Sequence, residues 1–400
     1  MARTFSRRDF LKASSATVVA GGTVLGQEGK GKRVRKGDMV YRRLGRTDLM
    51  VSEISLGGSP APNEMLFGRA IARGVNYIDT SENYEKGNSE RRIGKMMKGR
   101  RDKFHVATKC HPRRLRPPTK EGIIGMAEAS LKRLDSDYID IYMVHGASRP
   151  GDLTHEAVLD AFAQLKKDGK IRFTGASLHG KVPDMAKALI ECGHYDVMNI
   201  PYNVYQRVKS EKGKKYEDYL KRTGIEDVLA LAKSKDIGVV AMKSMGGGSF
   251  QKLDRYLTGD TTVPQAKLKW VLENDAVGTI VSELLNADIL KENLAVVGTG
   301  LTRRERSALY RYADATSSDH CRMCGTCQEA CPNGVATTDI QRYLAYHDGY
   351  GKRTLARRSY AALPAGARAS RCRDCGACEQ ACPYGVTIRQ HLHRAMQVLT

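Results

Sequence analysis

The cysteines are the residues of this 400-residue chain whose spacing most clearly predicts chemistry. Eight of the ten lie after residue 320, in the two runs "CRMCGTCQEACP" and "CRDCGACEQACP". Each run is spaced C-x2-C-x2-C-x3-C-P, and the second repeats the first at an offset of 51 residues. Three thiolates this close together can wrap one face of a cubane iron–sulfur cluster. We therefore predict eight iron ligands: Cys321, Cys324, Cys327, Cys331, Cys372, Cys375, Cys378 and Cys382.

Both runs follow the bacterial ferredoxin pattern, in which the cysteine before proline typically ligates the other cluster. The pattern predicts two [4Fe-4S] clusters, one held by Cys321, Cys324, Cys327 and Cys382, the other by Cys372, Cys375, Cys378 and Cys331. A zinc site has no use for the third cysteine of each run, and disulfide scaffolds are not packed at this spacing. Apolar positions at helical spacing between the runs predict a mainly α-helical two-cluster domain.

Four ionisable residues form a second group of chemical interest. Asp79, Lys109 and His145 each close a short apolar run, in "VNYID", "HVATK" and "DIYMVH", and Tyr84 follows Asp79 by five residues. Each alone has an ordinary structural explanation, such as a salt bridge or a buried histidine. Four such residues at successive strand ends indicate a catalytic site instead.

The elements that position these four residues alternate between β-branched runs and longer amphipathic stretches. From about residue 40 to 310, "ISLGG" is followed by runs such as "VNYIDT", "FHVATK", "YIDIYMVH", "IRFTGAS", "YDVMNI", "IGVVAMK" and "VGTIVS", with helical patterns between them. Close to eight strand–helix repeats predict a closed (β/α)8 TIM barrel, an α/β fold whose chemistry sits at the carboxyl ends of the strands. No strand is followed by G-x-G-x-x-G, which counts against a Rossmann unit.

The stretches "YRRLGRTDLMVSEISLGG", "GVNYIDTSENYEKGNSE", "VATK", "DYIDIYMVHG" and "GKIRFTGAS" resemble the aldo-keto reductase family in both order and spacing. With the cysteine runs, the chain resembles the members that carry a C-terminal 4Fe-4S dicluster domain. The resemblance implies a catalytic tetrad of Asp79, Tyr84, Lys109 and His145, and hydride transfer between a nicotinamide and a small carbonyl or alcohol substrate.

The tetrad makes chemical sense for carbonyl reduction, which needs a hydride on carbon and a proton on oxygen. Tyrosine near pKa 10 is a poor acid and a poor base at neutral pH. We expect the buried ammonium of Lys109 to lower the pKa of Tyr84, with Asp79 holding Lys109 charged. We expect His145 to donate a hydrogen bond to the substrate carbonyl oxygen.

The resemblance also implies cofactor contacts, at Ser177, Asn199, Lys243, Glu292 and Asn293. The pattern departs from the family at Met242, where an aromatic residue usually stacks under the nicotinamide. It departs again at Glu283 and Ile289, where NADP-preferring members have basic residues. An acidic side chain would repel a 2′-phosphate, so the sequence leaves open NAD, NADP or a weakened nicotinamide site.

The amino terminus resembles a twin-arginine export signal. Arg7 and Arg8 precede Phe10 and Leu11, and a weakly apolar stretch follows over residues 13–25. Iron–sulfur clusters are inserted in the cytoplasm, so a cluster protein would need to be exported folded. We therefore predict a periplasmic protein whose signal segment engages only the export machinery. The predicted domains are a signal and basic linker (1–37), the barrel (38–312) and the 4Fe-4S dicluster domain (313–400).

The formal net charge of +22 is spread along the chain, without aromatic and basic residues interleaved. This pattern argues against nucleic acid as a partner and favours a basic surface that steers an acidic redox partner protein or an anionic substrate. The charged segment over residues 206–227 reads as a lid or as a solvated helix.

Two functions stay open. The first is a carbonyl–alcohol oxidoreductase coupled to electron transfer through both clusters. The second is an exported electron-transfer protein whose barrel is a non-catalytic docking scaffold. A retained nicotinamide would separate them.

Overall fold

A computed structural model describes residues 23–25, 33–179, 181–206, 224–246 and 261–400. The twin-arginine motif and most of the charged segment after residue 206 lie outside these ranges. Within them, eight parallel strands close into a barrel in the order β10-β11-β12-β5-β6-β7-β8-β9. The strands are β5 (Ile54–Gly57), β6 (Tyr77–Asp79), β7 (His105–Cys110), β8 (Ile139–Ala147), β9 (Ile171–Leu178), β10 (Val197–Pro201), β11 (Gly238–Met242) and β12 (Val277–Ser282). Each contains or overlaps one of the predicted strand runs, so the predicted (β/α)8 barrel is confirmed.

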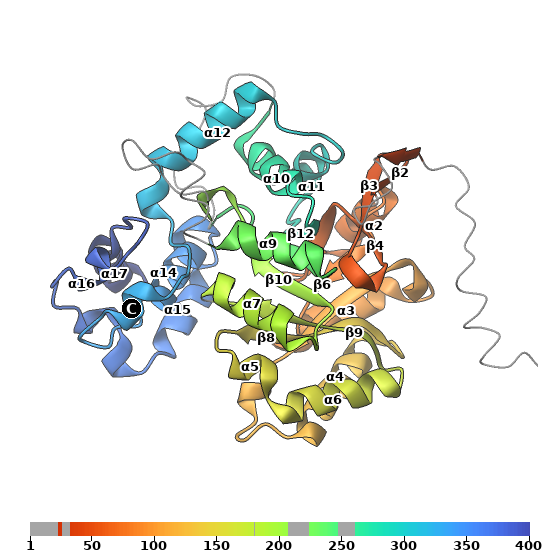
Figure 1. The fold of residues 1–400 in the computed structure, drawn as a ribbon, viewed down its shortest axis with the longest axis horizontal. Helices are drawn as coiled ribbons and strands as arrows, with labels where there is room; N and C mark the ends of the chain where they lie inside the picture. The colour runs from red at the N-terminus through yellow and green to blue at the C-terminus, as the bar shows by residue number, and fades with distance from the viewer. Residues whose placement is uncertain (1–22, 26–32, 180, 207–223, 247–260) are drawn as a thin grey trace, which may run out of the picture.

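Helices surround the barrel and bury their apolar faces on it (Figure 1). They are α2 (Glu64–Ala72), α3 (Asn88–Met97), α4 (Lys120–Leu134), α5 (Gly151–Thr154), α6 (Glu156–Lys167), α7 (Val182–Cys192), α9 (Ile225–Ser234), α10 (Val263–Glu273) and α11 (Ala287–Leu294). Several begin at side-chain caps: Thr119 caps α4, and Thr262 forms a capping box with Gln265 at α10. These caps fix where each helix begins, and hence the length of the loop between strand and helix.

A small antiparallel sheet closes the amino-terminal end of the barrel. It consists of β1 (Thr23–Leu25), β2 (Arg33–Lys36), β3 (Met39–Arg43) and β4 (Met50–Ser52). Leu44 packs here with apolar side chains from inside the barrel, and Gly238 lies so close that an added Cβ would come within 2.8 Å of its side chain. This end is filled with apolar residues, so chemistry is confined to the opposite end. β2 lies in the range predicted as signal and linker and pairs with β3.

The chain leaves the barrel through α12 (Arg303–Ala315), whose Leu309 and Tyr312 pack into the barrel core. Residues 320–400, called here the cluster domain, form a separate apolar core. Its helices are α13 (Thr326–Glu329), α14 (Thr337–Leu344), a π-helical turn η7 (Ala345–Gly349), α15 (Arg353–Ala361), α16 (Ala377–Gln380) and α17 (Ile388–Val398). The prediction of a mainly helical carboxyl-terminal domain is confirmed.

The cluster domain lies against the carboxyl ends of the barrel strands, away from β2 and β3 (Figure 1). Lys352 bonds the Ser59 carbonyl at 2.6 Å and Glu283 Oε1 at 2.5 Å, both in loops that follow barrel strands. Arg322 donates to the Tyr205 carbonyl at 2.8 Å. The domain therefore covers the end of the barrel where the predicted chemistry lies. In the described part of the chain, no helix combines the length and apolarity needed to cross a membrane.

Candidate active site

A buried ion pair forms the base of the site. Lys109 Nζ lies 2.5 Å from Asp79 Oδ1 and donates to the Thr80 carbonyl at 2.7 Å. Asp79 ends β6 and Lys109 lies near the end of β7, and neighbouring parallel strands bring the two together. Burial raises the pKa of Asp79 and lowers the pKa of Lys109, while their mutual attraction opposes both shifts. Either partner alone would be an uncompensated buried charge.

The Tyr84 ring stands beside this pair. Lys109 Nζ lies 5.4 Å from the ring centroid, and the His145 ring meets Tyr84 edge-on at 5.6 Å between centroids. Tyr84 and His145 line one cavity together with Asp79, and Lys109 is bound to Asp79. The pKa of Tyr84 is raised well above 10, first by burial and then by Asp79, Tyr346 and Glu283. The expectation of a lowered pKa is wrong, because burial is the largest cause of the shift and Lys109 directs its hydrogen bonds to Asp79 and Thr80.

Three histidine rings line the same cavity. His145 lies 4.3 Å from His111 and 6.1 Å from His179 between ring centroids. Burial lowers the pKa of His145 well below 6.5, and Lys109, His111 and His179 lower it further, so the ring is neutral at pH 7. The Ser81 hydroxyl lies 2.8 Å from His145 Nδ1 and 2.8 Å from Asn83 Oδ1, which fixes the orientation of the ring.

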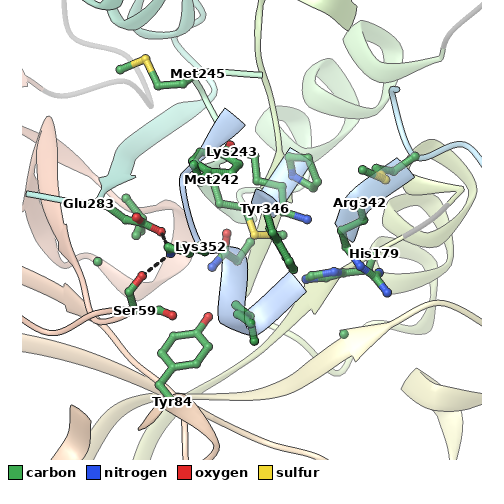
Figure 2. A pocket seen from close by; sticks show the side chains of 18 of the residues that line it. Ser59, Tyr84, His179, Met242, Lys243, Met245, Glu283, Arg342, Tyr346 and Lys352 are labelled. Atoms are coloured by element: carbon green, nitrogen blue, oxygen red, sulfur yellow. Dashed lines mark hydrogen bonds and ion pairs between the residues drawn. The ribbon is translucent and has the colours of Figure 1, made fainter. Parts of the chain in front are cut away.

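One large cavity of about 1380 Å³ opens over these groups and is lined by both the barrel and the cluster domain. The barrel contributes Asp79, Tyr84 and His145, and the cluster domain contributes Arg342 and Tyr346, among others. Figure 2 shows Tyr84 on one side of the cavity and Tyr346, Arg342 and Lys352 on the side of the cluster domain. The volume exceeds the ~300–1,000 Å³ of ordinary small-molecule sites. It can hold a dinucleotide together with a substrate.

Two buried polar atoms at the cavity fit a nicotinamide. The Asn199 amide donates to Asp79 Oδ2 at 3.2 Å, but its carbonyl oxygen has no partner among the described residues. The Ser244 hydroxyl is likewise buried without a described partner, and both residues line the cavity. A carboxamide would satisfy such groups, which otherwise cost free energy. Ser177 is buried, lies 3.3 Å from His179 Nε2 and is not part of the cavity lining.

The other predicted cofactor residues lie along the cavity near β11 and β12. Lys243, with a left-handed φ of 54°, follows β11, and Met242 beside it also lines the cavity. Glu292 and Asn293 line it from α11; Glu292 accepts from the Thr262 hydroxyl at 2.6 Å, and Asn293 donates to Ser282 at 2.8 Å. All the predicted cofactor residues except Ser177 therefore border one space.

The two cysteine runs share a backbone conformation. Met323 and Asp374 have φ values of 59° and 53°, and their amides donate to Cys321 Sγ at 3.3 Å and Cys372 Sγ at 3.4 Å. Such N–H···S bonds stabilise thiolates that hold iron–sulfur clusters. The same loop therefore occurs twice, once in each cysteine run.

The thiols of the first predicted ligand set lie near one another. Burial raises the pKa of Cys321, and the nearby thiols of Cys324, Cys327 and Cys382 raise it further. These are the four residues predicted to hold one cluster, and a set of four thiols suits iron. No group of three or more His, Cys, Asp or Glu side chains in the described ranges could hold a single metal ion.

The sequence did not reveal the cavity residues that come from the cluster domain. Arg342, Tyr346 and Lys352 lie in a stretch whose helical spacing was clear, but nothing in that spacing showed which face would meet the barrel. Ser81 and His111 were also missed, although both are polar residues near predicted strand ends. Their position next to the four catalytic candidates was the available signal.

Comparisons with known proteins agree with this architecture. Residues 63–258 match the aldo/keto reductase family, and residues 320–387 match the 4Fe-4S dicluster domain. An uncharacterized oxidoreductase, YqkF, of Bacillus subtilis is 27% identical over 296 residues, covering 68% of this chain and 95% of the relative. An NADH-specific methylglyoxal reductase of Escherichia coli is 27% identical over 323 residues, covering 68% of this chain and 98% of the relative. The solved aldo-keto reductase AKR11C1 of Bacillus halodurans is 26% identical, with a TM-score of 0.56, and the match covers 68% of this chain and 95% of the solved chain.

Proposed function

We propose that the chain, an oxidoreductase of the aldo-keto reductase type with an iron–sulfur domain, interconverts a carbonyl and an alcohol with a nicotinamide cofactor. The observation that carries the proposal is the cavity lined by Tyr84, His145 and Asp79, with Lys109 bound to Asp79. The unpartnered Asn199 oxygen at its edge suits a carboxamide. A nicotinamide bound there supplies or accepts the hydride.

In the reducing direction, Tyr84 is the general acid. Its raised pKa keeps the phenol protonated at neutral pH but makes it a weaker acid, so proton transfer depends on stabilisation of the phenolate that forms. Transfer leaves a phenolate beside the Lys109 ammonium, which stabilises the new negative charge until solvent returns a proton. His145 donates to the same oxygen from Nε2 in the tautomer whose Nδ1 accepts from the Ser81 hydroxyl, which requires that hydroxyl to turn from Asn83 Oδ1 to the ring.

Glu283 favours NADH over NADPH in this proposal. It lies on the cavity wall after β12, where a 2′-phosphate would meet a carboxylate. The relative named as an NADH-specific reductase supports this choice. The Glu283→Gln variant, which removes the negative charge, should narrow the difference between the two dissociation constants.

Export and coupling to the clusters belong to the same proposal. The paired arginines Arg7 and Arg8 support export of the folded protein to the periplasm. Exposed arginines beside the exposed Cys375, such as Arg371 and Arg373, support an acidic partner protein that exchanges electrons with the clusters. An export assay of Arg7→Lys/Arg8→Lys tests the first point, and salt-dependent reduction by acidic ferredoxins tests the second.

The second candidate function is an electron-transfer protein with a non-catalytic barrel. The ion pair between Lys352 and Glu283 favours it, because this pair crosses the cavity edge where a cofactor would enter. Anaerobic titration with NADH and NADPH, followed by nicotinamide fluorescence, separates the two functions. Saturable binding with turnover of methylglyoxal supports the enzyme, and no binding to cluster-loaded protein supports the scaffold.

A further inference from the structure

We propose that the cavity binds the carboxylate of an oxo acid or hydroxy acid through Arg342 and Tyr346, so that the cluster domain completes the substrate site. The inference rests on the proposed function and names its substrate class. Arg342 lies near the end of α14, and Tyr346 follows four residues later in the π-helical turn η7. Residues four apart on a helix share a face, and π-helical turns frequently occur at functional sites.

This face points into the active-site cavity. Both residues line it, together with Tyr84 and His145 from the barrel. Figure 2 shows Arg342 and His179 next to each other and Tyr346 nearer the centre of the cavity. Tyr346 contributes to the raised pKa of Tyr84, and Arg342 helps to lower the pKa of His179. The arginine and the phenol are therefore close enough to the catalytic candidates to hold one small substrate between them.

The charges around this part of the cavity call for an anion. The pKa of Lys243 is lowered to about 7, first by burial and then by repulsion from the Arg342 guanidinium. Arg342 is paired with Asp339, whereas the Lys243 ammonium has no hydrogen-bond or ion-pair partner in the described ranges. His145 and His179 are neutral at pH 7, so they add donors without charge. A carboxylate would relieve the repulsion and gain charge-assisted hydrogen bonds.

The position of Arg342 favours a substrate over the phosphates of a dinucleotide. His179 follows β9, while the predicted adenine-side residues Glu292 and Asn293 follow β12. In the barrel order these strands are separated by β10 and β11. Arg342 thus lies on the β9 side of the cavity, away from the adenine-side residues, and the non-reacting end of a substrate would lie there.

The test compares two aldehydes that differ in one charge, 4-carboxybenzaldehyde and its methyl ester. The expected wild-type kcat/KM is at least tenfold higher for the acid, and Arg342→Gln should lose about 10–100-fold on the acid and little on the ester. Arg342→Lys keeps the charge without the planar fork and should recover part of the preference. Arg353→Gln is the matched control, because it removes the same charge from an exposed position outside the cavity and should leave both rates unchanged.

A binding measurement separates this inference from the proposed function. Equilibrium dialysis of terephthalate, an unreactive dicarboxylate, should show saturable binding to the cluster-loaded protein that Arg342→Gln and Tyr346→Phe weaken. Such binding without turnover of either aldehyde would support the anion site and contradict the proposed catalysis. The inference is overturned by equal rates on acid and ester in the wild type, by absent terephthalate binding, or by an Arg342→Gln variant that loses NADH affinity instead.

Discussion

Removal of one oxygen atom, by Tyr84→Phe, tests the acid–base chemistry with little change to packing. The phenylalanine ring keeps both the edge contact with His145 at 5.6 Å and the position 5.4 Å from Lys109 Nζ. The substitution therefore removes only the hydroxyl group, which is the proton donor. General acid catalysis contributes about 10²–10⁴-fold in rate, which corresponds to about 3–5 kcal/mol of barrier. We expect methylglyoxal reduction to fall by that factor, with nicotinamide binding unchanged.

The raised pKa of Tyr84 also predicts a difference between the two directions. Reduction uses the phenol, which stays protonated below pH 10, so its rate should be flat between about pH 6 and 9. Oxidation uses the phenolate, present at pH 7 in fewer than about one molecule in 10³. The oxidation rate should therefore rise about tenfold per pH unit over the same range.

The assay follows absorbance of the reduced nicotinamide under anaerobic conditions in both directions. Tyr77→Phe is the matched control, because this buried tyrosine lies on β6 within the filled end of the barrel and its hydroxyl has no partner in the described chain. A Tyr84→Phe variant that keeps more than about a tenth of the wild-type rate would refute the role of the hydroxyl. A reduction rate that declines steadily from pH 6 to 9 would refute the raised pKa.

Three further outcomes are expected. Lys109→Met removes the ion-pair partner of the buried Asp79 and should lower the free energy of unfolding by about 3–5 kcal/mol, measured by urea titration. The double variant Lys109→Met/Asp79→Asn should recover most of the stability but no activity. An unchanged stability of the single variant would contradict the ion pair. Asp140 is fully buried, and His105, Arg101 and the Val106 amide lower its pKa to about 2. Its contribution of about 2 kcal/mol to the free energy of unfolding is therefore present above pH 4 and lost toward pH 2. Urea unfolding curves of Asp140→Asn should lack this part of the pH dependence, and the same pH dependence in both proteins would refute it. Cys372→Ser should lower bound iron from about eight atoms per chain toward about four, measured by elemental analysis, and an unchanged iron content would exclude it as a ligand.

The barrel could be predicted from the sequence because each strand coincides with a short apolar run between helical patterns. Asp79, Lys109 and His145 stood out as ionisable residues at or near the ends of such runs, and parallel pairing of β6, β7 and β8 brings them together without any long-range information. The repeated cysteine spacing likewise showed the cluster loops, which share a backbone conformation in the structure. The local sequence pattern was therefore sufficient to predict features that are built by elements next to each other in the chain.

The part of the cavity lining that the cluster domain contributes could not be predicted, because it depends on how the cluster domain docks on the barrel. Arg342 is 163 residues along the chain from His179 and Tyr346 is 262 from Tyr84, and helical periodicity leaves the choice of buried face open. The direction of the Tyr84 pKa failed for a related reason. Proximity to Lys109 was visible in the motif, but neither the burial that raises the pKa nor the further contribution of Tyr346 from the docked domain was visible there.

Deuterium transfer tests the central claim most directly. Cluster-loaded protein is incubated without oxygen with methylglyoxal and NADH that carries deuterium at C4 on either face, and the alcohol product is analysed by mass spectrometry. The account predicts one deuterium on the former carbonyl carbon from one face of the cofactor only, and none with Tyr84→Phe at equal times. A product formed without deuterium from either face, or no product from protein that binds NADH, would contradict hydride transfer at this barrel.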